Sequence, residues 1–298
     1  MVPIRVVPAF DAPEEILMLV RCNGPYRSIA SNLPPSATTS ARDESDAGTT
    51  AAWFRGNWVV AGEARVPGAE AILDNARFAD AAARLFGVEY VTPSTVVVNV
   101  NAPMPAGAVH VDIPSFRGAN RDRYPLQLLQ AMGASGLFED WRINEAGAVT
   151  WFYDGVGGAY DYWPDGLDGP MHSEQPPYFN TALVADNDRM YHRIGAVGDE
   201  GRRGALYPAS AHIAHLGDGW AVACGDRVLD TFADADVRIS ILWKAQIPLA
   251  EPAEALTTEQ IVSVLGSDLR RRRTAAAEPL TEEWINLIHR TYYPTLPD

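Results

Sequence analysis

The most constraining feature of this sequence is a series of short β-type segments between residues 92 and 248. Runs of β-branched and aromatic residues alternate there with Gly, Pro, Asn and Asp, which typically end strands and form turns. The predicted strands are Thr92–Val100, Val149–Tyr153, Asn180–Ala185, Met190–Val197, Trp220–Ala223 and Val237–Ala245. Several short strands with this punctuation predict a barrel or sandwich and argue against alternating βαβ units.

Helical periodicity lies mainly outside this β-rich region. The predicted helices are Asp11–Cys22 with Asp11 as its cap, Gly68–Phe86 with Gly87 as its stop, Pro125–Met132, Thr257–Leu269 and Thr281–Thr291. Ser31–Thr50 is rich in small polar residues and Pro, which predicts a loop or lid, or an insertion without function. We therefore expect a single domain over residues 1–298. This domain would consist of an N-terminal segment of helices and loops that supports the core (1–91), the β core itself (92–248) and C-terminal helices (249–298).

Composition excludes several classes of function. The formal charge is −14, from 24 basic and 38 acidic residues, and such a surface repels phosphate backbones and anionic lipids. We therefore expect no nucleic-acid and no membrane partner. The N-terminus has no signal-peptide pattern, no apolar stretch is long enough to span a bilayer, and the two cysteines form no redox or zinc motif. These features favour a cytoplasmic protein.

His110-Val111-Asp112 is the first candidate for metal chemistry. In a strand, side chains two residues apart point to the same face, so this imidazole and this carboxylate can reach one ion. A second imidazole from another strand would complete a 2-His-1-carboxylate triad with open positions for a chelating cosubstrate and O₂. With six histidines and 38 acidic residues, such a pair is expected about once by chance. The pattern alone is therefore weak, and its context matters.

The surroundings of three motifs supply that context. The segment from His110 to Gly118 resembles the first metal-binding strand of the iron(II)/2-oxoglutarate-dependent dioxygenases. The segment from Val184 to Arg193 is similar to the strand that carries the distal histidine of that family, here His192 after an Asp-Asn turn. Val237–Ile241 resembles the Arg-x-Ser strand of the family. The three motifs occur in the required order, each on a predicted strand.

Arg238 and Ser240 are also candidates on chemical grounds that do not depend on the family resemblance. Both side chains share one face of the predicted strand. A guanidinium can grip the distal carboxylate of a diacid through two charge-assisted hydrogen bonds, and the hydroxyl adds a third. These two residues are therefore the candidate cosubstrate-binding pair.

The resemblance implies a mainly β protein with a double-stranded β-helix, a jelly-roll core flanked by N- and C-terminal helices. It implies Fe(II), 2-oxoglutarate and O₂ as cofactor and cosubstrates. The catalytic and metal-binding residues would be His110, Asp112 and His192, and the reaction would oxidise, most commonly hydroxylate, a small-molecule substrate with release of succinate and CO₂. We name Arg117, Trp151 and Tyr153 as candidate substrate-binding residues, the last two from an aromatic band that also suits core packing.

Alternatives stay open at this point. His192 and Arg238 lie farther apart in sequence than the family pattern usually has them. Either an insertion at Gly198–Gly219 extends a loop, or the distal ligand is His212 or His215, in a stretch that suggests loop or helix. Arg193 and Arg117 are alternative candidates for the anchor of the diacid. Two alternative functions are a metal-dependent jelly-roll enzyme that needs no 2-oxoglutarate and a non-catalytic jelly-roll binding module.

Overall fold

The computed structural model describes residues 1–32, 49–248, 254–272, 274, 277–293 and 296. Most of the predicted loop Ser31–Thr50 lies outside these residues. The chain forms two compact units. Unit 1 comprises Met1–His110 and Glu145–Pro248, and unit 2 comprises Val111–Asn144 and Leu249–Asp298.

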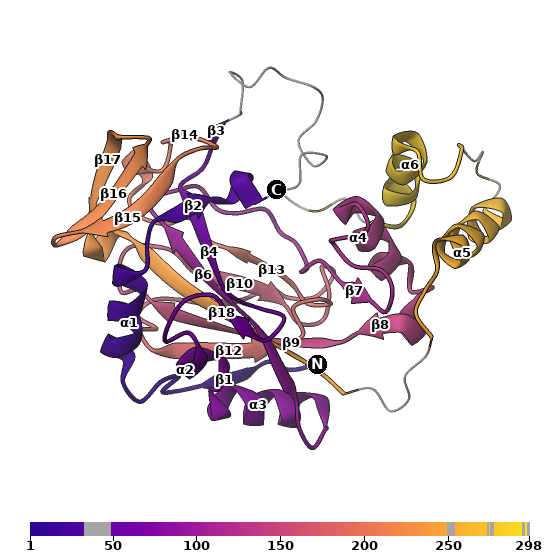
Figure 1. Cartoon of the computed structure of the whole chain (residues 1–298), viewed down its shortest axis with the longest axis horizontal. Helices are drawn as coiled ribbons and strands as arrows, with labels where there is room; N and C mark the ends of the chain where they lie inside the picture. Colours follow the sequence, from indigo (N-terminus) through magenta and orange to yellow (C-terminus); the bar gives the residue numbers. More distant parts are fainter. Residues whose placement is uncertain (33–48, 249–253, 273, 275–276, 294–295, 297–298) are drawn as a thin grey trace. The chain divides into compact units, whose positions relative to one another are not determined.

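A large antiparallel sheet dominates unit 1 (Figure 1). Its strands run in the order β1-β12-β9-β18-β6-β4-β2-β15-β16-β17, with β5 paired to β4. They are β1 (Ile4–Val6), β2 (Tyr26–Ser28), β4 (Trp53–Val60), β5 (Glu63–Ala64), β6 (Thr92–Asn101), β9 (Glu145–Phe152), β12 (Thr181–Ala185), β15 (His212–Leu216), β16 (Gly219–Cys224), β17 (Arg227–Ala233) and β18 (Arg238–Gln246). The central strand β18 pairs with β6 on one side and β9 on the other.

A smaller sheet has the order β11-β10-β13, formed by β10 (Tyr160–Trp163), β11 (His172–Glu174) and β13 (Tyr191–Ile194). The segment from Met104 to His110 extends it, because isolated antiparallel bridges join Met104 to Val197 and His110 to His192. From β6 to β13 the chain passes back and forth between the two sheets, and β15 to β18 then all belong to the large sheet, with β18 at its centre. This two-sheet arrangement is the jelly-roll core expected from the sequence. A separate pair, β3 (Thr49–Thr50) with β14 (Tyr207–Pro208), completes the strands of unit 1.

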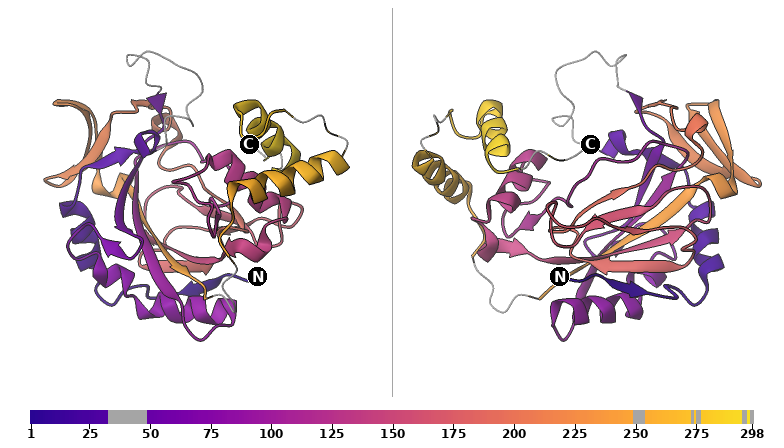
Figure 2. Two further views of the ribbon diagram at one scale, coloured as in Figure 1. Left: turned by 45° about the vertical axis from the view of Figure 1, so that its right-hand side comes forward. Right: turned by 180° about the vertical axis from the view of Figure 1, so that it is seen from behind.

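Three helices lie on the outer side of the large sheet, α1 (Pro13–Cys22), α2 (Glu70–Leu73) and α3 (Ala76–Phe86) (Figure 2). Trp243 of β18 points toward them, since its Nε1 donates to the Leu73 carbonyl at 2.8 Å and its ring contacts Phe78 at 5.8 Å. Because side chains alternate along a strand, Arg238, Ser240 and Leu242 point to the other face of the sheet. That inner face meets the small sheet, as the contact between Trp151 and Tyr160 shows.

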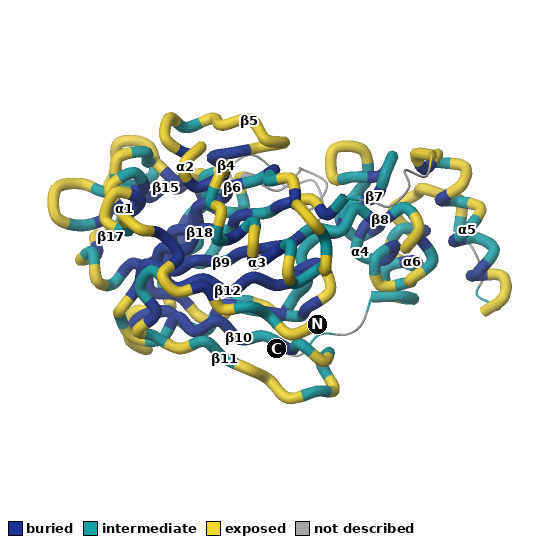
Figure 3. The backbone as a smooth tube through the Cα atoms, turned by 90° about the horizontal axis from the view of Figure 1, so that it is seen from below, coloured by how far each residue is buried: buried dark blue, intermediate teal, exposed yellow. Residues whose placement is uncertain are grey.

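The central strands of the large sheet are mostly buried (Figure 3). All five residues of β12 are buried, and six of eight in β9. A strand that alternates faces is buried throughout only when both of its faces are covered. The helices cover one face here and the small sheet covers the other, so the interior between the two sheets is shielded from solvent.

Unit 2 has its own hydrophobic core. Its elements are β7 (Ser115–Phe116), β8 (Arg142–Ile143), α4 (Leu126–Ser135), α5 (Thr258–Arg271) and α6 (Glu282–Tyr292). Phe138, Leu265, Trp284 and Ile288 are among its buried residues. No helix in the described part of either unit is long and apolar enough to cross a membrane.

The prediction of a mainly β fold with flanking helices is confirmed, and several details differ. The predicted helix Gly68–Phe86 is broken after Leu73, because Asn75 caps α3 by accepting hydrogen bonds from the backbone of Arg77 and Phe78. Asp11 does not cap α1, whose N-cap is Ala12; Asp11 pairs with Arg77 instead. Residues 1–91, expected as support, also contribute β1, β2, β4 and β5 to the large sheet.

Candidate metal centre

The two histidines of the candidate site lie directly opposite each other on neighbouring segments of the small sheet. His110 and His192 form reciprocal backbone hydrogen bonds, His110 N to His192 O at 3.0 Å and His192 N to His110 O at 2.8 Å. Directly opposed residues in an antiparallel pair point their side chains the same way. Their ring centroids are accordingly 4.4 Å apart. Backbone pairing thus places two imidazoles side by side, with His192 buried and His110 half-buried.

Each imidazole is oriented by a carbonyl two residues before it. His110 Nδ1 lies 2.9 Å from the Ala108 oxygen, and His192 Nδ1 lies 2.9 Å from the Met190 oxygen. A carbonyl oxygen only accepts, so Nδ1 carries the proton in both rings. With Nδ1 protonated, Nε2 is the unprotonated nitrogen of each ring and the one that can coordinate a metal. The carbonyls fix the rings as outer partners of metal ligands commonly do.

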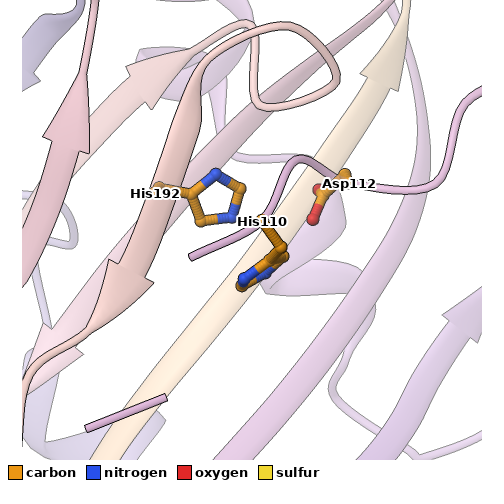
Figure 4. A group of neighbouring side chains, drawn as sticks. All are labelled: His110, Asp112 and His192. Atoms are coloured by element: carbon orange, nitrogen blue, oxygen red, sulfur yellow. The ribbon is translucent and has the colours of Figure 1, made fainter. Parts of the chain in front are cut away.

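Asp112 completes the group (Figure 4). One ligand atom from each of His110, Asp112 and His192 lies within 4.8 Å of the other two. Ligands at about 2.1 Å from one ion in an octahedral face lie about 3 Å apart, so modest side-chain rotations bring these atoms into a single coordination sphere. Two neutral imidazoles and one carboxylate form the donor set of a 2-His-1-carboxylate site. The residues fit such a metal.

One part of the sequence argument was wrong. His110 does not open a strand, because it forms only an isolated bridge and residues 111–114 have no regular structure. His110 and Asp112 therefore do not converge through strand alternation. The backbone turns after the bridge, and Asp112 points back toward the histidines (Figure 4).

Arg238 is the second notable feature of the interior. It is 2% exposed, and its Nε donates to the Gly158 carbonyl at 2.8 Å while Nη1 donates to Ser240 Oγ at 3.2 Å. Among the described residues, no carboxylate lies within ion-pair distance of Arg238, and Nη2 makes no hydrogen bond. A buried guanidinium without an anion is unfavourable, so this environment favours the binding of an anionic ligand.

Aromatic contacts connect Arg238 with His192. The Tyr178 hydroxyl lies 3.4 Å from Arg238 Nε and donates to the Gly158 carbonyl. The Tyr178 ring contacts Trp151, Trp151 contacts Tyr160, and Tyr160 contacts His192, at centroid distances of 4.9, 5.4 and 5.6 Å. A chain of aromatic contacts thus links the arginine to His192 through the interior between the two sheets.

Tyr153 and Tyr178 both lie beside Arg238. Burial raises the pKa of the Tyr153 hydroxyl to about 12, and burial also raises the pKa of Tyr178, with Arg238 acting in the opposite direction. Both phenols therefore stay protonated at neutral pH and serve as neutral hydrogen-bond donors. Tyr153 uses its proton on the Val156 carbonyl at 2.8 Å.

The alternative ligands and anchors lie elsewhere. His212 and His215 belong to β15, which is a strand and not the expected loop or helix. His215 Nε2 lies 3.4 Å from Asp234 Oδ1. Arg193 pairs with Asp161 at 3.0 Å, and Arg117 lies in unit 2, where it donates to the Asp140 carbonyl at 2.8 Å. The long stretch of sequence between His192 and Arg238 contains the strands β14 to β17. This insertion is larger than the loop that the sequence predicted.

Two residues near Arg238 were missed by the sequence analysis. Tyr178 follows two prolines and belongs to no motif, and Gly158 contributes only its carbonyl. The positive φ of Gly158 is available to glycine without strain, and a side chain there would come within 2.9 Å of Arg238 and Tyr153. A Gly-Gly pair before a strand was the one signal that could have indicated this close approach.

No protein-family model matches the sequence, and no curated protein sequence matches it. Solved structures do show similarity. A 2OG-Fe(II) oxygenase family oxidoreductase from Burkholderia pseudomallei aligns with a TM-score of 0.44 and 16% identity, over 82% of this chain and 84% of that one. A prolyl-4-hydroxylase from Pseudomonas putida aligns with a TM-score of 0.37 and 13% identity, over 83% and 93%.

The ribosomal oxygenase YcfD from Escherichia coli, solved with cobalt and 2-oxoglutarate, aligns with a TM-score of 0.28 and 7% identity, over 94% of this chain and 56% of that one. All three are oxygenases or hydroxylases. Because the TM-scores are below 0.5, we derive function from the chain's own side chains.

Proposed function

We propose that this protein is a non-haem iron(II) oxygenase that uses 2-oxoglutarate and O₂ to oxidise a small-molecule substrate. The observation that carries the proposal is the convergence of His110, Asp112 and His192, with Nδ1 of both imidazoles held by a backbone carbonyl. These three residues would hold iron(II) as a 2-His-1-carboxylate site, a donor set that leaves coordination positions for a cosubstrate and O₂. When bound there, iron(II) supplies the activation of O₂ that protein side chains alone do not provide.

Each residue of the set has a definite task in this proposal. The two neutral imidazoles favour a transition metal over Mg²⁺ or Ca²⁺, which prefer oxygen ligands. Asp112 contributes the single negative charge among the protein ligands and neutralises part of the charge of the ion. The carbonyls of Ala108 and Met190 hold the rings in place, so little reorganisation accompanies metal binding.

The choice of 2-oxoglutarate rests on Arg238 and Ser240. A buried, fixed guanidinium without a carboxylate partner in the described residues selects an anion, and a neighbouring hydroxyl adds hydrogen-bonding capacity. A diacid whose oxo-acid end binds the metal presents its second carboxylate to such a site. The buried aromatic side chains Tyr160, Trp151 and Tyr178 lie along the path between these two ends.

Charge and the aromatic lining support a small-molecule substrate. The formal charge of −14 disfavours nucleic acid. On the inner face of the small sheet, Tyr162 is half-buried and its ring stacks on His172 at 5.5 Å, while Tyr162 itself pairs with His192 in register. This surface beside the metal ligands suits an apolar or planar substrate. Arg117 and Tyr153 remain candidate substrate contacts.

The proposal is tested by anaerobic titration of iron(II) and 2-oxoglutarate, followed by the visible charge-transfer absorption of the chelate. We expect the band in the wild-type protein and its loss in His192→Ala. His215→Ala is the matched control, because His215 pairs with Asp234 and lies outside the triad. It should retain the band.

Asp112→Asn should bind iron more weakly, because the substitution removes the only anionic protein ligand of the site. Equilibrium dialysis with iron(II) measures this directly. In air, the wild-type protein should convert 2-oxoglutarate to succinate. A protein that binds iron but shows neither the band nor succinate formation would refute the proposed function.

A further inference from the structure

The polar groups around Arg238 form a set of hydrogen-bond donors. Arg238 presents Nη2, and Ser240 Oγ, which already accepts from Nη1, can still donate its own proton. Tyr178 directs its proton to the Gly158 carbonyl. A donor set of this kind is complementary to a group that only accepts, and a carboxylate is such a group.

The register of the large sheet places one further residue in this set. Ser240 lies directly opposite Trp151 in the pairing of β18 with β9, so the two side chains leave the sheet side by side on the inner face. Trp151 also contacts Tyr178, whose hydroxyl touches Arg238. Trp151, Tyr178, Ser240 and Arg238 therefore form a closed group around one point of the interior, and each is at most 4% exposed.

The indole nitrogen of Trp151 is an unused donor. The residue is 0% exposed, and its Nε1 finds no hydrogen-bond partner among the described residues. A buried N–H without an acceptor destabilises the folded protein, by about 1–3 kcal/mol in general. Two other buried tryptophans of this sheet, Trp220 and Trp243, donate to Asp234 and to the Leu73 carbonyl, each at 2.8 Å. Trp151, by contrast, has a buried indole N–H with no acceptor among the described residues.

We propose that Trp151 Nε1–H donates to the distal carboxylate of the 2-oxo diacid and is a specificity-determining residue of the cosubstrate site. This inference rests on the proposed function. It assigns Trp151 to the binding of the cosubstrate, whereas the sequence analysis named it as a candidate substrate-binding residue. One carboxylate oxygen faces the Arg238 guanidinium and Ser240, and the indole binds the carboxylate from the neighbouring strand. The buried Nε1 of Trp151 then acquires an acceptor, and so does Nη2 of Arg238, which makes no hydrogen bond to the described residues.

The experiment compares two 2-oxo acids of equal chain length in Trp151→Phe. 2-Oxoglutarate carries the distal carboxylate, and 2-oxovalerate has a methyl group in its place. Both are titrated against the anaerobic iron(II) protein, and their dissociation constants are read from the chelate absorption. Phe keeps most of the aromatic body and removes the N–H. Loss of one hydrogen bond to a charged group predicts about 10- to 100-fold weaker binding of 2-oxoglutarate, while 2-oxovalerate should change less than about twofold.

Trp243→Phe is the matched control. It removes an indole N–H from the same sheet but on the opposite face, so both dissociation constants should stay at their wild-type values. Circular dichroism and the melting temperature of both variants establish that they are folded.

Equal weakening of the two acids in Trp151→Phe would overturn the proposal, since the indole would then act on the oxo-acid end or on packing. Unchanged affinity for 2-oxoglutarate would also overturn it. Failure of the proposed function is distinct, because the wild-type protein would then give no chelate absorption with either acid.

Discussion

Replacing Arg238 with Met tests whether this arginine binds a ligand or stabilises the fold. Met has a similar length and fills irregular space well, so the substitution removes the charge and the donors with little change in packing. If Arg238 is held for a ligand, the ligand-free protein should tolerate the substitution and the affinity for 2-oxoglutarate should collapse. A structural arginine would show the opposite pattern.

The magnitudes follow from the contacts of Arg238. In the ligand-free protein the substitution removes two good hydrogen bonds, at 2.8 and 3.2 Å, worth about 1.5–3 kcal/mol each when a charged group takes part. It also removes a guanidinium that is 2% exposed, and burying such an ion costs several kcal/mol. The two effects oppose each other, and we expect the free energy of unfolding to change by less than about 2 kcal/mol. The loss of two bonds to the ligand predicts about 10²- to 10⁴-fold weaker binding.

Two measurements test this prediction on one protein preparation. Urea denaturation of the metal-free protein gives the free energy of unfolding. Anaerobic titration gives the dissociation constant for 2-oxoglutarate, and a thermal shift provides an independent check. At 100 times the dissociation constant, 2-oxoglutarate should stabilise the wild-type protein by about 2.7 kcal/mol, and the same concentration should leave Arg238→Met almost unshifted.

Arg142→Met is the control. Arg142 is equally buried, but it pairs with Glu139 at 3.1 Å, so its loss should lower stability and leave 2-oxoglutarate binding unchanged. The reasoning would be refuted if Arg238→Met lost more than about 4 kcal/mol of stability without ligand, or if it retained wild-type affinity.

Other predictions concern stability. Asn75→Ala should cost about 1–2 kcal/mol, because Asn75 Oδ1 accepts from the backbone of Arg77 and Phe78 and Nδ2 donates to the Ala9 carbonyl; Asp11→Ala, which removes only an exposed ion pair, should change the melting temperature little. Hydrogen bonds from Arg272 and then Tyr292 lower the pKa of the Asp268 carboxyl. A lowered pKa in the folded state stabilises α5 and α6 above the unfolded pKa and withdraws that stability as the pH falls through the folded value. Circular dichroism from neutral to strongly acidic pH should therefore show acid loss of helix, and Asp268→Asn should be less stable at neutral pH but less sensitive to acid.

The sequence carried enough information to predict the three metal-binding candidates and the Arg-x-Ser pair. Those residues sit on short segments whose local pattern and order are both informative. The convergence of Asp112 was predicted for the wrong reason, because strand alternation was assumed where the backbone has no regular structure. The outcome was the same because two residues of separation keep the ligands close in either conformation.

Other features depend on contacts between distant segments, which local patterns do not encode. Trp53–Val60 has strong β-forming residues, but nothing in its own sequence indicates pairing with β6. The role of Tyr178 arises only when the loop before β12 meets Arg238. The unsatisfied indole of Trp151 is a property of its surroundings, so it had no sequence signal at all.

The central position of β18 has a consequence for synthesis of the protein on the ribosome. This strand is the last of the sheet to be synthesised, yet it lies between β6 and β9, which are synthesised well before it. Until it emerges, the nascent chain has two unpaired strand edges flanking apolar surface, which favours association with chaperones or aggregation. The strand that closes this gap also delivers Arg238, so the growing polypeptide acquires its diacid-binding residue in the same event that completes the barrel.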